Sequence, residues 1–117
     1  MNNEKLTLLL RRFTVAVQAH QAALEDMDEE RANAHARVVS GLHAAIIREG
    51  DAGREGLLAL LDSESQVVAG MAAVFSLQYN PSRSIGVLRK LSDRGGLLGF
   101  RASVALERWE SGEWDEP

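Results

Sequence analysis

One run of this sequence has no polar face at all: Val67-Val68-Ala69-Gly70-Met71-Ala72-Ala73-Val74-Phe75-Ser76-Leu77. No charged residue occurs between Glu64 and Arg83. A helix that is apolar on every side is a buried helix. The run is far shorter than the roughly 20 apolar residues that cross a bilayer, and Asn80-Pro81 ends it. It therefore predicts the central helix of a soluble bundle, with Ser63 as its N-cap and Gln66 completing a capping box.

Amphipathic helices are predicted on both sides of this central helix. Apolar residues recur at spacings of three and four, the helical pattern, in residues 4–24, 29–49, 52–61, 81–94 and 97–110. Gly50 and Gly112 are natural helix stops, and Asn80 can cap a helix whose first residue is Pro81. Alanine and leucine dominate the composition, which favours helix over strand. These patterns predict an all-α fold of about six helices in three antiparallel hairpins.

Two segments of the chain share a pattern. Gly56-Leu-Leu-Ala-Leu-Leu-Asp-Ser is echoed by Gly86-Val-Leu-Arg-Lys-Leu-Ser-Asp, and a longer alanine-rich helix follows each. Short helix, tight turn and longer helix, repeated, is typical of an α-α superhelix. We therefore predict a single helical-repeat domain over residues 1–117. It would comprise an opening hairpin (1–50), two repeat-like hairpins (51–80 and 81–112) and a tail (113–117).

The second half of the chain resembles a family of small bacterial HEAT/armadillo-like proteins of unknown function. The resemblance is carried by these segments: Leu57-Leu-Ala-Leu-Leu-Asp, Tyr79-Asn80-Pro81, Val87-Leu88, Gly95-Gly-Leu-Leu-Gly-Phe100, Ala105-Leu106-Glu107 and Trp109-Glu-Ser-Gly112, with Ala32-Asn33 in the second helix. It implies an α-α superhelix of the HEAT/armadillo-like type, and it supplies no established activity. For function it implies an immunity-like or adaptor-like role beside a bacterial toxin.

Composition excludes several classes of function. The chain has no cysteine, which rules out disulfides, thiolate metal sites and cysteine nucleophiles and suits a reducing cytoplasm. The formal net charge of −4 argues against a nucleic-acid partner, because phosphate binding needs a concentrated basic surface. No predicted helix is a membrane span. We therefore expect a cytoplasmic protein that binds neither nucleic acid nor membrane.

The leading interpretation is a non-catalytic interaction module whose partner is another protein. Helical-repeat proteins bind through the surface lined by the second helix of each pair. Seven residues are candidates for that surface: Asn33, Arg37, Gln66, Gln78, Arg101, Arg108 and Trp114. Trp114 either anchors a partner or folds back on the domain, and the acidic segment Glu25 to Glu30 caps a helix or attracts a basic partner. This interpretation predicts no enzyme activity and no cofactor.

Two alternatives stay open. The first is a small ligand-binding or metal-binding protein, or an enzyme, that uses His20 and His35 facing each other across the opening hairpin. It requires a concave pocket in which these histidines are accessible from solvent, whereas core histidines would have their ring nitrogens bonded to the protein. The second alternative is self-association as a homodimer, because a short superhelix has two open ends. No metal site follows from the sequence itself.

Overall fold

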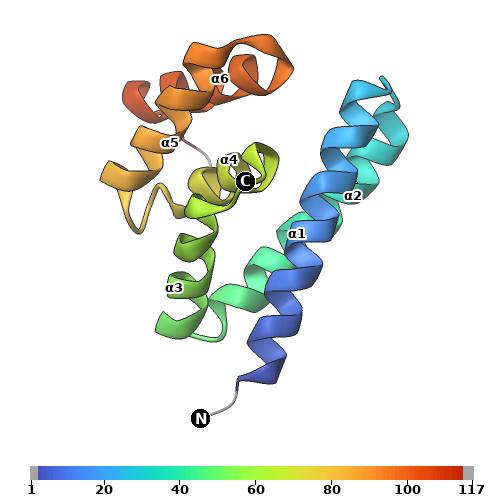
Figure 1. Cartoon of the computed structure of the whole chain (residues 1–117), viewed down its shortest axis with the longest axis vertical. Helices are drawn as coiled ribbons and strands as arrows, with labels where there is room; N and C mark the ends of the chain where they lie inside the picture. Colours follow the sequence, from blue (N-terminus) through green and yellow to red (C-terminus); the bar gives the residue numbers. More distant parts are fainter. Residues whose placement is uncertain (1–2, 115–117) are drawn as a thin grey trace. The chain divides into compact units, whose positions relative to one another are not determined.

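A computed structural model describes residues 3–114, and its regular structure is entirely helical (Figure 1). Within this range the elements are α1 (Glu4–Glu25), α2 (Glu29–Ile47), α3 (Asp51–Ala59), the 3₁₀ turn η1 (Leu60–Asp62), α4 (Gln66–Ser76), α5 (Pro81–Arg94) and α6 (Gly96–Ser111). The predicted all-α fold with six helices is therefore confirmed. Contacts divide the chain into two units, Met1–Leu57 and Leu58–Pro117. This division falls inside α3, and the predicted single domain with hairpin boundaries at Gly50 and Asn80 stays a prediction.

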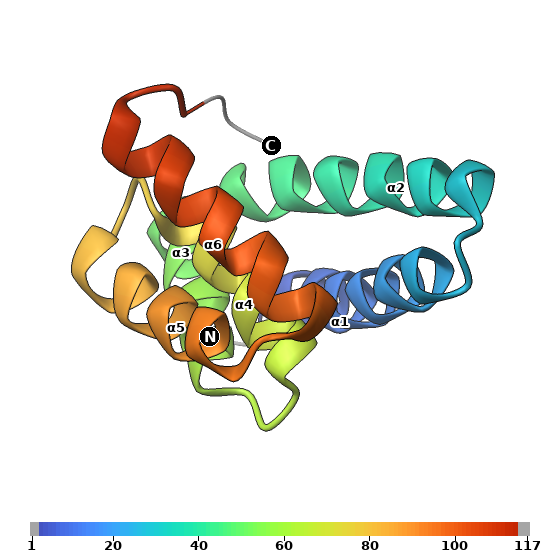
Figure 2. The same ribbon diagram turned by 90° about the horizontal axis from the view of Figure 1, so that it is seen from above.

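Unit 1 (Met1–Leu57) is built on the antiparallel hairpin of α1 and α2, which lie side by side in both views (Figures 1 and 2). Its core contains Phe13, Val17, Ile46 and Leu57, whose side chains are fully buried. The turn from α2 into α3 is tight, because a β-carbon at Gly53 would overlap the carbonyl oxygen of Ile46. Only glycine therefore fits at this crossing without backbone movement.

Unit 2 (Leu58–Pro117) packs α4, α5 and α6 so that each of these helices contacts the other two (Figure 2). The core cluster consists of Leu61, Ala72, Ala73, Leu77, Leu88, Leu91, Ala102, Ala105 and Leu106. Small side chains in this cluster let the helices approach closely. An ion pair between Arg83 and Asp62, at 3.1 Å, joins the start of α5 to η1. The predicted burial of the central helix is confirmed, since no residue from Val67 to Leu77 is exposed.

The N-termini of α5 and α4 test the capping residues that the sequence predicts. Asn80 caps α5, with its side-chain oxygen accepting from the Arg83 N–H at 3.3 Å, and Pro81 is the first residue of that helix, as predicted. The predicted cap of α4 is wrong. Ser65, not Ser63, accepts from the Val68 N–H, at 3.3 Å. The reason is η1, which extends the preceding helix by one turn and uses the Ser63 N–H to close that turn on Leu60.

Candidate interaction surface

Unit 2 exposes apolar side chains on α6, on the side away from its core. Leu97 is 43% exposed and Phe100 is 66% exposed, and the half-buried Val104 follows Phe100 by one turn on the same side of the helix. Helical geometry places these three residues in one row, because their spacings of three and four residues return to the same face. The opposite face carries the buried residues Gly99, Ala102, Ala105 and Leu106. Exposed apolar side chains that gather in a row, rather than singly, indicate a contact surface.

Two arginines border this row. Arg101 and Arg108 are seven residues apart, so they lie two turns apart along one edge of the helix. Arg101 is half-buried, and this burial lowers the pKa of its guanidinium, because desolvation disfavours the charged form. Arg108 is exposed and forms no ion pair with any residue from 3 to 114. We call Leu97, Phe100, Arg101, Val104 and Arg108 the α6 outer face.

The four remaining polar candidates lie at other places. Asn33 and Arg37 are both exposed on α2 in unit 1, one helical turn apart and therefore on one face. Gln66 and Gln78 are exposed in unit 2, but Gln66 begins α4 and Gln78 follows its C-terminal end. Of the polar residues proposed from the sequence, Arg101 and Arg108 alone share a helix face with a row of exposed apolar side chains.

Trp114 lies against the core of unit 2. Of the two arrangements that the sequence left open, partner anchor or fold-back on the domain, this is the fold-back. Its ring meets that of Trp109 edge to face, with centroids 6.0 Å apart and planes at 80°. Both rings pack on the core cluster, and Trp114 is half-buried. The indole N–H of Trp114 is buried without a hydrogen-bond partner in the part of the chain that the structure describes. A role for Trp114 in partner binding stays a prediction.

The two candidate histidines differ in exposure. His20 on α1 is buried, with 8% of its surface exposed, and His35 on α2 is half-buried. Among residues 3–114, no group of three or more histidine or carboxylate side chains is arranged to hold a metal ion. A ligand site here would need a histidine that a solute can reach, and the burial of His20 weighs against one.

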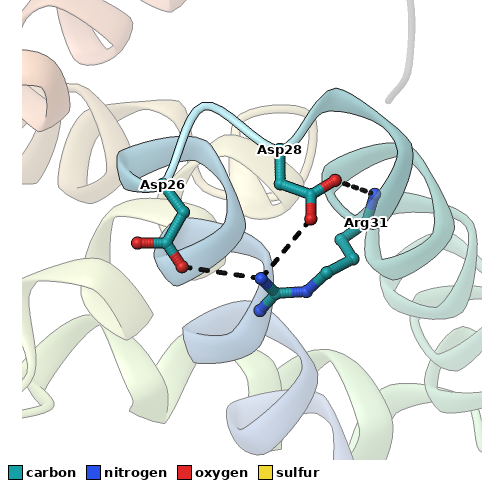
Figure 3. Close-up of polar contacts among 3 residues, drawn as sticks. All are labelled: Asp26, Asp28 and Arg31. Atoms are coloured by element: carbon teal, nitrogen blue, oxygen red, sulfur yellow. Dashed lines mark hydrogen bonds and ion pairs between the residues drawn. The ribbon is translucent and has the colours of Figure 1, made fainter.

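The acidic segment Glu25 to Glu30 forms the tip of the α1–α2 hairpin, and part of its charge is used locally (Figure 3). Asp28 caps α2 by accepting from the Arg31 N–H at 3.1 Å. The Arg31 guanidinium lies 3.5 Å from Asp26 and 3.6 Å from Asp28, bridging the two carboxylates across the turn. The capping role expected of this segment is therefore confirmed, and attraction of a basic partner stays a prediction.

Leu97 and Phe100 are the surface residues that the sequence analysis did not single out. The buried stripe of α6 carries Ala102, Ala105 and Leu106. A signal for Phe100 was present, because a large aromatic residue stood off that stripe, on the side expected to face solvent.

Comparison with known proteins extends the fold assignment. No family model matches the sequence, and no curated protein matches it. The chain is similar to a solved structure, the crystal structure of the protein RPA1889 from Rhodopseudomonas palustris CGA009, with a TM-score of 0.84 and 18% sequence identity. The match covers 96% of this chain and 93% of that chain. At this level of identity the likeness shows that the two proteins share a helical fold.

A separate finding concerns membranes. None of the helices described here combines the length and the apolar character needed to cross a bilayer.

Proposed function

We propose that this protein is a non-catalytic protein–protein interaction module of the cytoplasm, and that the α6 outer face is its binding surface. The observation that supports the proposal is the exposure of Phe100 beside Leu97, bordered by two arginines. Aromatic residues and arginine are enriched in the buried centres of protein interfaces. A solvent-exposed phenyl ring contributes little to the stability of the folded monomer, whereas burying it in a complex lowers the free energy of binding.

The mode of action that fits this surface is occlusion or scaffolding by shape and charge. The sequence resemblance to HEAT/armadillo-like proteins supports a repeat-type superhelix, and with it an immunity-like or adaptor-like role. The absence of cysteine is compatible with a reducing compartment. The alternative of a histidine-based ligand site or enzyme has less support, because His20 is buried.

Affinity capture tests the proposal. The tagged wild-type chain is compared with Phe100→Ala and with Val15→Ala, which removes an apolar side chain of similar exposure, 62%, from α1. We expect one protein to be recovered with the wild type and with Val15→Ala and to be lost with Phe100→Ala. The purified partner should then form a complex with the wild type in size-exclusion chromatography. Equal thermal melting of the three chains shows that loss of binding is not loss of folding.

A second pair of variants tests α2 as the binding surface in case Phe100→Ala leaves partner binding unchanged. Asn33→Ala and Arg37→Ala alter the exposed face of α2 in unit 1. A partner that is lost with these variants and kept by Phe100→Ala would support an interaction module but move its binding surface to α2. Recovery of no partner, together with a metal or small molecule in the purified protein, would contradict the proposal and favour the histidine site.

A further inference from the structure

We propose that the side chain of Trp114 is a reversible lid on an aromatic-binding site beside Trp109, and that a phenylalanine side chain of a partner replaces it there. The site lies at the C-terminal end of α6, against the core cluster of unit 2. It is therefore separate from the α6 outer face, and the inference goes beyond the proposed function.

The site already holds an aromatic ring, that of Trp114. The rings of Trp114 and Trp109 meet edge to face, which is a preferred geometry for aromatic pairs. Both rings pack on the core cluster, whose two least-buried members, Ala105 and Leu106, precede Trp109 by one turn of α6. When Trp114 leaves, the ring of Trp109 and the part of the core cluster beneath Trp114 lose their cover.

Trp114 is joined to α6 by a short connection that can move without unwinding the helix. Gly112 ends the helix in the left-handed conformation, and its N–H bonds to the carbonyl oxygens of Arg108 and Trp109. The Glu113 N–H bonds to the Arg108 carbonyl oxygen at 3.0 Å. In the described part of the chain, the backbone hydrogen bonds of this helix end stop at Glu113. Rotation of the backbone between Glu113 and Trp114 therefore releases the ring and leaves the helix end intact.

The indole N–H makes Trp114 an imperfect occupant of the site. This N–H is buried and has no hydrogen-bond acceptor among residues 3–114. A buried donor without an acceptor has given up its bond to water and gained none in return, which favours release of the ring. A phenyl ring makes the same edge-to-face contact with Trp109 and carries no polar hydrogen, whereas a tyrosine hydroxyl would bring a similar cost. Phenylalanine is therefore the aromatic side chain that fits this site best.

NMR spectroscopy of the full chain tests the inference, with Trp114→Ala removing the lid. The chain has two tryptophans, so this variant leaves the indole N–H of Trp109 as its single indole signal. The probes are the N-acetyl amides of phenylalanine and leucine. We expect the phenylalanine probe to shift the Trp109 signal at about tenfold lower concentration in Trp114→Ala than in the wild type, where the site is open only part of the time. The leucine probe should bind more weakly, because it has no ring to meet that of Trp109. No shift in Trp114→Ala, an equal response of the wild type, or equal binding of the two probes would each overturn the inference.

A second variant tests the lid itself and gives an answer even if Trp114→Ala unfolds. Trp114→Phe keeps a ring in the site and removes the unbonded N–H, so we expect it to melt at least as high as the wild type. Its lid should be open less often, so more of the phenylalanine probe should be needed to shift the Trp109 signal. Val15→Ala, which alters an exposed apolar residue of α1, is the matched control and should respond to the probe as the wild type does. A lower melting temperature of Trp114→Phe, or tighter binding of the probe to it than to the wild type, would contradict the inference.

Discussion

Two serines of unit 2 show how the surroundings of a single hydroxyl group decide its contribution to stability. The side chain of Ser84 on α5 is fully buried, and its oxygen has no hydrogen-bond partner in the described part of the chain. The Ser103 hydroxyl on α6 instead donates to the Gly99 carbonyl at 3.1 Å and pairs with the hydroxyl of Ser92 on α5. A buried polar atom without a partner carries a desolvation cost that a bonded one avoids.

Substitution of these two serines by alanine should therefore have opposite effects. Ser84→Ala removes an unsatisfied hydroxyl and adds helix propensity, so we expect the free energy of unfolding to rise by about 1 kcal/mol. Ser103→Ala removes the hydrogen bond to Ser92 on α5 and the one to Gly99 within α6, and should lower the free energy of unfolding by about 1 kcal/mol. Urea denaturation followed by circular dichroism measures both values. A loss of stability in Ser84→Ala would mean that its hydroxyl is satisfied in solution.

At the scale of elements, the crossing of α5 and α6 depends on one glycine. A β-carbon built on Gly99 would lie 2.7 Å from the carbonyl oxygen of Leu91 and 3.3 Å from that of Ser92. Both neighbours are backbone atoms of α5, so they cannot move aside as the end of a side chain can. Gly86, inside α5, differs: it is exposed, and a β-carbon there would meet nothing within 4 Å.

These two glycines make a matched pair for mutagenesis. Gly99→Ala should push α6 away from α5 and lower the free energy of unfolding by about 1–3 kcal/mol, the usual cost of overpacking. Gly86→Ala should raise it by about 0.5–1 kcal/mol, since alanine is the better helix former. Thermal and urea unfolding of both variants measure the effect. If Gly99→Ala were as stable as the wild type, the two helices would not be in close contact.

Helices were predictable from the sequence where their position depends on a few neighbouring residues alone. Asn80 with Pro81 marks a helix start by itself, and the apolar run of α4 is buried whichever helices cover it. The start of α4 was misplaced because Ser63 and Ser65 are equally good caps. The choice between them depends on η1, and nothing in the residues alone distinguishes a 3₁₀ turn there from the end of a helix.

The candidate surface was predictable only in part. Arg101 and Arg108 were identified because charged residues are expected to face solvent. Phe100 was not, because standing off the buried stripe does not by itself show whether a neighbouring helix covers the side chain. The burial of His20 and the position of Trp114 are likewise set by tertiary packing. Sequence reasoning therefore found the charges of this surface and missed the apolar row that they border.

At the scale of the whole molecule, the exposed apolar row raises the question of self-association. The wild-type chain should be a monomer, because pairing two α6 outer faces would bring arginine next to arginine and the chain as a whole is acidic. Light scattering coupled to size-exclusion chromatography, from dilute solution to the highest soluble concentration, measures this. A dimer that Phe100→Ala converts to monomer would support the homodimer alternative and contradict this expectation.

The tip of the α1–α2 hairpin exposes a side chain that oxidants can reach. Met27 holds a left-handed backbone conformation, with φ of 56°, and its side chain is 91% exposed. Its thioether sulfur is therefore open to peroxide, whereas Met71 is half-buried in α4. Under mild oxidation the sulfoxide should form at Met27 before Met71, and without disturbing a core that Met27 does not help to fill. Oxidation at the tip of the α1–α2 hairpin should therefore leave the fold intact, which mass spectrometry of peptides and circular dichroism after peroxide treatment would measure.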